Sequence, residues 1–197
     1  GRRVNVAGQG ATPDFMFRKL LKTAGLDPDR DLSLDYALPY PETAVALAAG
    51  KISCAVLPEP FATLAKLQNP ALRSPLDFGA LWTAATGQKS YPMTAFVVSS
   101  RLASERPLAV RSLLEAYASS IAWVLAKPAE AGALVERLDL GLKAAVAAKA
   151  IPRSAYVFEK APASRPSIES LLGVFLEMAP ASVGGKLPDD GFYASFE

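Results

Sequence analysis

The sequence contains no histidine and a single cysteine, Cys54. The lack of histidine excludes Ser-His-Asp and Cys-His nucleophiles, a histidine general base and His-ligated zinc or haem. A single cysteine excludes internal disulfides, four-cysteine zinc sites, iron–sulfur clusters and CxxC redox chemistry. What remains is carboxylate or lysine chemistry, or no catalysis at all. We expect no metal site, no cofactor and no catalytic residue.

Long apolar runs and a dominant charge sign are missing as well. No run approaches the roughly 18 apolar residues of a membrane-spanning helix, so we expect a chain that does not itself span a membrane. The 21 Lys and Arg and 19 Asp and Glu residues are interspersed and give a net charge of +2. No basic run is long enough to predict binding to nucleic acid. With 197 residues, 51% of them hydrophobic, the chain can form one domain or two small ones around a buried core.

The first ninety residues alternate strand and helix signals. Alternating or continuously apolar segments predict strands at 2–7, 32–37 and 52–57. Segments with helical spacing, several of them begun by proline and ended by glycine, predict helices at 12–24, 41–49 and 61–67. This order predicts an α/β fold in which a parallel-rich sheet is flanked by helices. Cys54, inside an apolar strand, is predicted to be a packed small hydrophobe.

The second half is predicted to be mainly helical. Strands are predicted at 93–99 and, shorter, at 156–158. Apolar residues at helical spacing predict helices at 104–126, 128–140, 142–150 and 166–178. We therefore expect two domains: an α/β lobe at 1–94, and a crossing strand followed by a helical region at 95–197.

Three loops follow the predicted strands, and parallel strands bring such loops to one edge of the sheet, where ligands bind. The loops are Gly8-Gln9-Gly10-Ala11-Thr12, Pro39-Tyr40-Pro41-Glu42 and Pro58-Glu59-Pro60. Each leads into a helix N-terminus, whose unpaired N–H groups and partial positive charge suit an anion or a polar head group. The plainer alternative is that the loops are turns and caps, with Thr12 as the N-cap of its helix.

Four further candidates stand at or beyond these loops. Glu42 fits favourable electrostatics at a helix N-terminus as well as it fits a ligand contact. Glu59 is favoured as a ligand contact because prolines on both sides, Pro58 among them, fix its backbone. Tyr91 predicts an aromatic wall or lid, with a simple turn as the alternative. Arg153 lies in a break between helices and is solvated unless that break faces the site.

The segment GQGATP also invites comparison with the dinucleotide-binding pattern GxGxxG. Pro13 stands where the third glycine would fall, although Asp35 follows a second strand as a ribose-binding acid would. The mismatch makes this a weak alternative.

Four phrases of the sequence together resemble a known family. In chain order they are GRRVNVAGQGATPDFMFRKLLKTAGLDPDRDLSLDY, ETAVALAAGKISCAVLPEPFAT, AIPRSAYVF and GGKLPDDGFY. They resemble the solute-binding proteins of bacterial ABC importers, in the nitrate/sulfonate/taurine and thiamine-pyrimidine-precursor group. The resemblance implies a periplasmic-binding-protein-like (type II) fold. Such a two-lobed α/β clamshell closes on a small ligand and delivers it, without catalysis, to a permease in the inner membrane.

Carried over to this chain, the resemblance implies that residues 8–12 and 57–60 are walls of the cleft in the second lobe. It places residues 91–94 in the crossing segment between lobes, and Arg153 near the cleft. It implies a periplasmic or lipid-anchored extracytoplasmic protein. Family members are longer, so we expect a fragment or a truncated gene product that lacks the N-terminal half of the first lobe, on which the region after residue 95 would pack. Ser53 stands where members usually carry an acid.

We therefore expect the substrate-binding component of an ABC transporter, which captures a sulfonate-, nitrate- or taurine-like solute or an aminopyrimidine. Two other functions on this fold stay open. A ligand-sensing domain of a transcription regulator would need a DNA-binding segment outside this chain. A pyrimidine-precursor enzyme would need a substitute for the histidine that such relatives use.

Overall fold

The computed structural model describes residues 2–196, which form two compact units. The first unit contains residues 2–92 together with Pro166–Leu187, and the second contains Met93–Arg165 together with 188–196. The predicted division after residue 94 lies close to the first of these boundaries. It does not anticipate the return of Pro166–Leu187 to the first unit.

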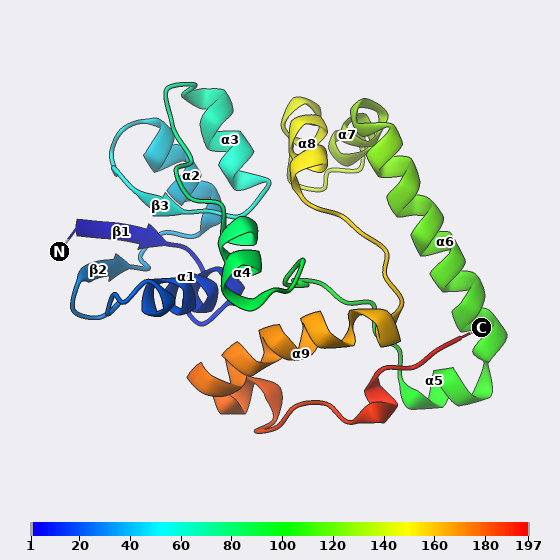
Figure 1. Cartoon of the computed structure of the whole chain (residues 1–197). Coiled ribbons are helices and arrows are strands. Elements are labelled where there is room, and N and C mark those ends of the chain that lie inside the picture. Colours follow the sequence, from blue (N-terminus) through cyan, green and yellow to red (C-terminus); the bar gives the residue numbers. More distant parts are fainter. Residues whose placement is uncertain (1, 197) are drawn as a thin grey trace. The chain divides into compact units, whose positions relative to one another are not determined.

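The first unit is built on a small parallel sheet. Within the described residues the sheet has three strands in the order β2-β1-β3, namely β1 (Arg2–Val6), β2 (Leu32–Asp35) and β3 (Ala55–Val56). Both outer strands pair with β1 in parallel. The three strands are followed in turn by α1 (Thr12–Thr23), α2 (Tyr40–Ala48) and α3 (Phe61–Gln68), as Figure 1 shows. The predicted α/β fold, with a small parallel sheet flanked by helices, is confirmed.

The central strand has two different faces, because side chains alternate along a strand. Val4 and Val6 are buried on one face, in a cluster with Phe17 of α1. Full burial of a valine contributes about 1.5–3 kcal/mol to stability. On the other face Asn5 is buried and donates a hydrogen bond of 2.7 Å to Asp35 at the end of β2.

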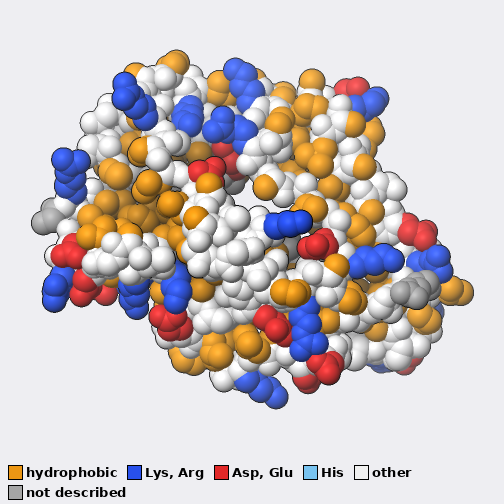
Figure 2. Space-filling model, in the orientation of Figure 1, with side chains coloured by type: hydrophobic (Ala, Val, Ile, Leu, Met, Phe, Trp, Pro, Cys, Tyr) orange, Lys and Arg blue, Asp and Glu red, His pale blue; other side chains and the backbone are white. Residues whose placement is uncertain are grey.

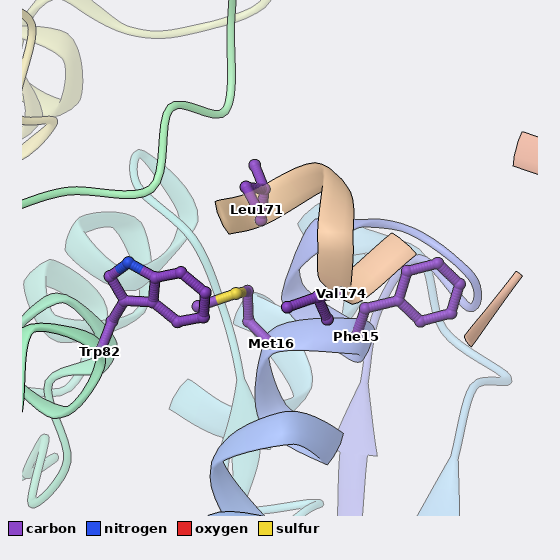
Figure 3. Close-up of a cluster of buried hydrophobic side chains, with 5 residues drawn as sticks. All are labelled: Phe15, Met16, Trp82, Leu171 and Val174. Carbon is purple, nitrogen blue, oxygen red and sulfur yellow. The ribbon is translucent and has the colours of Figure 1, made fainter. Parts of the chain in front are cut away.

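A second cluster explains why Pro166–Leu187 belongs to the first unit. Helices α4 (Phe78–Thr86) and α9 (Ala161–Met178) contribute Trp82, Leu171 and Val174, which pack with Phe15 and Met16 of α1. Figure 3 shows these five side chains converging, with the Met16 thioether beside the indole. Helix α1 is thus covered on both sides, by the sheet on one and by α4 and α9 on the other.

The second unit is helical, with α5 (Ser100–Glu105), α6 (Pro107–Ala126), α7 (Pro128–Arg137) and α8 (Ala144–Ala150). Helices α7 and α8 pack so closely that a β-carbon on Gly132 would collide with the backbone carbonyl of Ala144. Along α6, in contrast, Val110 alone is buried, and Leu108 is 77% exposed. Figure 2 shows hydrophobic side chains on the visible surface of this unit.

Short 3-10 helices complete the chain: η1 (Ile151–Arg153), η2 (Pro180–Val183) and η3 (Asp190–Phe192). In the second unit Arg165 forms an ion pair of 2.7 Å with Asp190. The same guanidinium lies 4.7 Å from the centre of the Tyr193 ring. These contacts fasten residues 188–196 to the second unit.

Several predicted elements need correction. The segments 93–99 and 156–158 are not strands, since no strand in residues 2–196 pairs with either of them. The predicted helix at 104–126 is two helices, because Pro107 has no N–H to continue α5 and Arg106 takes an extended φ of −139°. The predicted strand at 52–57 is reduced to Ala55–Val56 at the sheet edge. Cys54 is therefore exposed rather than packed.

Helix α6 departs from one further expectation. It has the length and the mean hydropathy, 1.3, of a membrane-spanning helix. It also carries Arg111 and Glu115, which form an ion pair of 3.2 Å on its surface. A single helix of this kind is weak evidence for a membrane span, because helices of soluble proteins and signal sequences meet the same criteria.

Candidate functional site

The candidate site is the edge of the sheet where all three strands end. Because β2, β1 and β3 are parallel and adjacent, the loops that follow them leave from this common edge. These are the loops at 8–12, 39–42 and 58–60 that the sequence singles out. That they bind a ligand stays a prediction.

Contacts between side chains and backbone join these loops. Gly8 has a φ of +77°, and a β-carbon there would collide with the hydroxyl of Tyr40. The Tyr40 ring in turn stacks on Phe61 at the start of α3, with ring centres 5.4 Å apart and planes 12° apart. Burial raises the pKa of the Tyr40 hydroxyl above its usual value. The edge of the sheet therefore presents a glycine turn beside a stacked aromatic pair.

The backbone of the first loop is largely engaged in its own hydrogen bonds. The Ala11 N–H donates to the carbonyl of Gly8 at 3.0 Å, and the Gly10 N–H donates to Asp14 Oδ2 at 2.9 Å. Two of the backbone donors expected to attract an anion are thus already used.

The expected cap at Thr12 is wrong. Ala11 is the N-cap of α1, Thr12 is the first helical residue, and no side-chain cap hydrogen bond is formed. The carboxylate of Asp14 accepts the Gly10 N–H, which is a contact with the preceding loop rather than a cap of the helix. Thr12 is half-buried and Gln9 is exposed, so both side chains remain candidates for ligand contact.

The two glutamates differ in their surroundings. Glu42 is exposed in the first turn of α2. The carboxylate of Glu59 accepts a hydrogen bond of 3.1 Å from the Thr63 N–H in the first turn of α3, and the Pro58 carbonyl accepts one of 3.0 Å from Ala62. Glu59 therefore has a structural role as a helix cap, and a ligand contact would come in addition to it.

Tyr91 and Arg153 lie away from the three loops along the chain. Tyr91 packs edge-on against Trp82 with ring centres 6.0 Å apart. Burial, with a smaller contribution from the charge of Asp77, raises its pKa. Its surroundings resemble those of a core residue more than those of a mobile lid. Arg153 ends η1 in the second unit and is exposed, and its role in ligand binding stays a prediction.

A shallow cavity of about 480 Å³ lies in the first unit. It is lined by residues 50–53 and by Arg3, Asn5, Asp35, Ala37 and Leu38. Asp35 accepts hydrogen bonds from the Ala37 N–H, Arg3 and Asn5, and these contacts, led by that of Ala37, lower its pKa. An acid held in this way is poorly placed to bind a ribose, so the dinucleotide alternative is disfavoured. No cluster of three His, Cys, Asp or Glu within residues 2–196 is arranged to hold a metal ion.

Comparison with known proteins places this architecture in a family. The model of the NMT1-like family matches residues 2–139, more than half of the chain. The chain belongs to the NMT1-like family. No curated protein matches its sequence. A crystal structure of an ABC transporter from Parabacteroides distasonis, at 1.75 Å resolution, matches with a TM-score of 0.83 and 28% identity. The match covers 99% of this chain and 66% of that protein, so the chain spans somewhat less than two thirds of its length.

Three residues of this NMT1-like chain matter at the loops in ways that the sequence analysis missed. Tyr40 lay inside a predicted loop, but its contact with Gly8 was not expected. Phe61 was assigned only to a helix start. Asp14 was not singled out, although its carboxylate accepts the Gly10 N–H of the first loop. For Tyr40 and Phe61 the available signal was an aromatic residue at the start of each of the helices that follow β2 and β3.

Proposed function

We propose that this chain is part of the substrate-binding component of an ABC importer. It would capture a small polar solute outside the cytoplasm, in the periplasm or on a lipid anchor, and present it to a permease in the inner membrane. The observation that carries the proposal is the arrangement of three loops at one sheet edge, joined through Gly8, Tyr40 and Phe61. The match of the chain to an ABC transporter structure supports the proposal.

The aromatic pair indicates what kind of ligand this wall accepts. Tyr40 and Phe61 are both half-buried, so part of their ring surface is open to a neighbouring group. Sites for small molecules combine such apolar surface with a few polar groups that fix orientation. A flat ring or the short alkyl part of a small solute fits this surface.

The charges of the same three loops indicate which of the expected solutes this wall favours. The loops at 8–12, 39–42 and 58–60 contain two glutamates and no lysine or arginine. With the Gly10 and Ala11 amides engaged, this wall offers little to an isolated anion. Among the expected solutes it favours an aminopyrimidine, whose amine and ring can meet an acid and an aromatic face. A sulfonate or nitrate would need a cation from outside these loops.

The second unit supports the idea of a larger binding protein. Leu108, Val157 and Val97 are 77%, 68% and 66% exposed. We propose that these side chains pack on a further lobe, as the resemblance to the clamshell family implies. We propose binding without turnover, as the resemblance to the clamshell family implies.

The test is calorimetric titration of the full-length gene product with 4-aminopyrimidine, taurine, ethanesulfonate and nitrate. We expect one saturable ligand, bound one to one. Phe61→Ala should weaken that binding about tenfold or more, because it removes half of the aromatic pair. Leu67→Ala, at the opposite end of α3 and 37% exposed, is the matched control and should leave affinity unchanged. A folded protein that binds none of the four solutes would contradict the proposal.

A further inference from the structure

We infer that Asp14, Tyr36 and Arg18 are positioning residues, which hold the loop at 8–12 in a preset shape at the edge of the sheet. The inference rests on the proposed function, since this loop is one wall of the proposed site. Asp14 contacts the loop through the Gly10 N–H, and Tyr36 and Arg18 act on the loop through Asp14.

The carboxylate of Asp14 is the centre of this network. Its side chain is only 3% exposed, and a buried carboxylate is unfavourable unless donors surround it. Asp14 Oδ2 accepts the Gly10 N–H at 2.9 Å. Asp14 Oδ1 accepts Arg18 Nε at 3.0 Å and the Tyr36 hydroxyl at 2.8 Å. Three donors from three segments of the chain therefore converge on one side chain.

The network links the ends of two neighbouring strands. Gly10 follows β1, and Tyr36 directly follows β2. The Tyr36 hydroxyl accepts a hydrogen bond of 3.0 Å from Arg18 while it donates to Asp14. Burial and the contact with Asp14 raise the pKa of Tyr36, so its hydroxyl stays protonated as the network requires.

Arg18 also contacts Asp29, in the loop that precedes β2. Its Nη1 lies 2.8 Å from Asp29 Oδ1. Partial burial alone would lower the pKa of Arg18, but the hydrogen bonds to Asp29, Tyr36 and Asp14 outweigh it and raise the pKa. The guanidinium is therefore a permanent charge that holds the Asp14 carboxylate in its orientation.

The loop is fixed a second time from the same segment. Tyr40, four residues after Tyr36, lies against Gly8. Residues 36–40 thus hold the loop at both of its glycines, at Gly8 by direct contact and at Gly10 through Asp14. A wall that is ordered before the ligand arrives saves the entropy of ordering it during binding.

The test compares two variants with a matched control in the full-length gene product. Tyr36→Phe removes one hydroxyl and keeps the ring, and Asp14→Asn removes the charge and keeps the shape. Lys19→Gln is the control, because it removes an exposed ion pair of α1 with Glu177 and none of the contacts of Asp14. The readout is amide hydrogen exchange at Gly10, measured by NMR together with the amides of β1.

We expect Gly10 to exchange about threefold to tenfold faster in Tyr36→Phe, and faster still in Asp14→Asn, as for the loss of one or more hydrogen bonds. Amides of β1 and the control variant should be unchanged. The same two variants should weaken binding of whichever solute of the titration panel binds.

The outcomes separate this inference from the proposed function. Unchanged exchange at Gly10, or equal acceleration at Gly10 and in β1, would overturn the positioning role while leaving ligand binding untouched. Acceleration confined to the loop with no solute bound would uphold the positioning role and contradict the proposed function. Acceleration confined to the loop with weaker binding would support both.

Discussion

The two units of this chain differ in how far they bury helices with similar apolar patterns. In the first, α1 lies between two buried clusters, and Met16, Val6 and Trp82 are at most 1% exposed. In the second, the longest helix, α6, buries Val110 alone. The difference shows that apolar residues at helical spacing predict which face of a helix is apolar. They do not predict which other segment packs on that face. Within the described residues, the first unit contains the segments that pack on the apolar face of α1, and the second unit contains few residues that pack on α6.

Truncation of a core side chain should separate the two units most strongly. Met16→Ala removes a fully buried side chain from the first unit and should lower the free energy of unfolding by about 2–5 kcal/mol. Leu108→Ala, on the exposed face of α6, should change it by less than about 0.5 kcal/mol. Urea unfolding followed by circular dichroism measures both. A comparable loss in both variants would show that α6 is covered in solution, and the comparison would fail.

A pair of glycines sharpens the account of the first unit. Gly8 and Gly10 have φ values of +77° and +73°, but only at Gly8 would a β-carbon meet Tyr40. Gly10→Ala should cost about 1–2 kcal/mol, the usual penalty for the left-handed region. Gly8→Ala should cost roughly 1 kcal/mol more, because the Tyr40 ring must move. In a Tyr40→Phe background the two costs should converge, and a persistent difference in urea unfolding would contradict the contact.

A second pair of glycines compares the units directly. Gly132→Ala should destabilise the second unit by about 1–3 kcal/mol, since the added methyl meets the backbone of α8. Gly173→Ala in α9 meets no atom within 4 Å and should stabilise the first unit by about 0.5–1 kcal/mol. Thermal unfolding of the two variants should shift in opposite directions. Shifts of the same sign would be evidence against the close packing of α7 on α8.

The smallest effect concerns charge. Lys19 of α1 lies 2.7 Å from Glu177 of α9, and its hydrogen bond lowers the pKa of Glu177 below the ordinary 4.5. A lowered pKa in the folded state gives stability that is present above the ordinary value and is lost as pH falls through the folded pKa. Because both groups are exposed, the contribution is at most about 0.2–1 kcal/mol. Glu177→Gln should reduce stability at pH 7 by that amount and have no effect at pH 2.

Unfolding at several pH values measures this effect, and Lys19→Gln is its control. In that background Glu177→Gln should produce little further change. An undiminished effect of Glu177→Gln without Lys19 would assign the pH dependence to another partner.

Much of the first unit was predictable because its signals are local. Proline at the start of α1 and glycines after α1 and α2, Gly25 and Gly50, fix helix ends through the backbone of the residue itself, and both glycines have positive φ. Likewise, the parallel orientation of the strands followed from the alternation of strand and helix. The common edge of the three loops then followed from topology alone.

The rest depends on contacts between distant residues. The preference of 93–99 for a strand is real in the sequence, but a strand exists only if another pairs with it. Asp14 meets Tyr36, and Tyr40 meets Phe61, across 22 and 21 positions of the sequence. No spacing rule predicts such contacts, because they depend on how α1, β2 and α3 pack. The site residues could therefore be placed at an edge, while their partners could not.

The central claim is that the loops at the carboxyl edge of the sheet form a ligand-binding wall. Hydrogen exchange across the full-length gene product, with and without the solute that binds in the titration, tests it most directly. We predict slower exchange at 8–12, around Tyr40 and at Glu59 and Phe61 when the solute is present. A solute that binds and slows exchange only elsewhere, for example at 50–53 beside the shallow cavity, would contradict the claim.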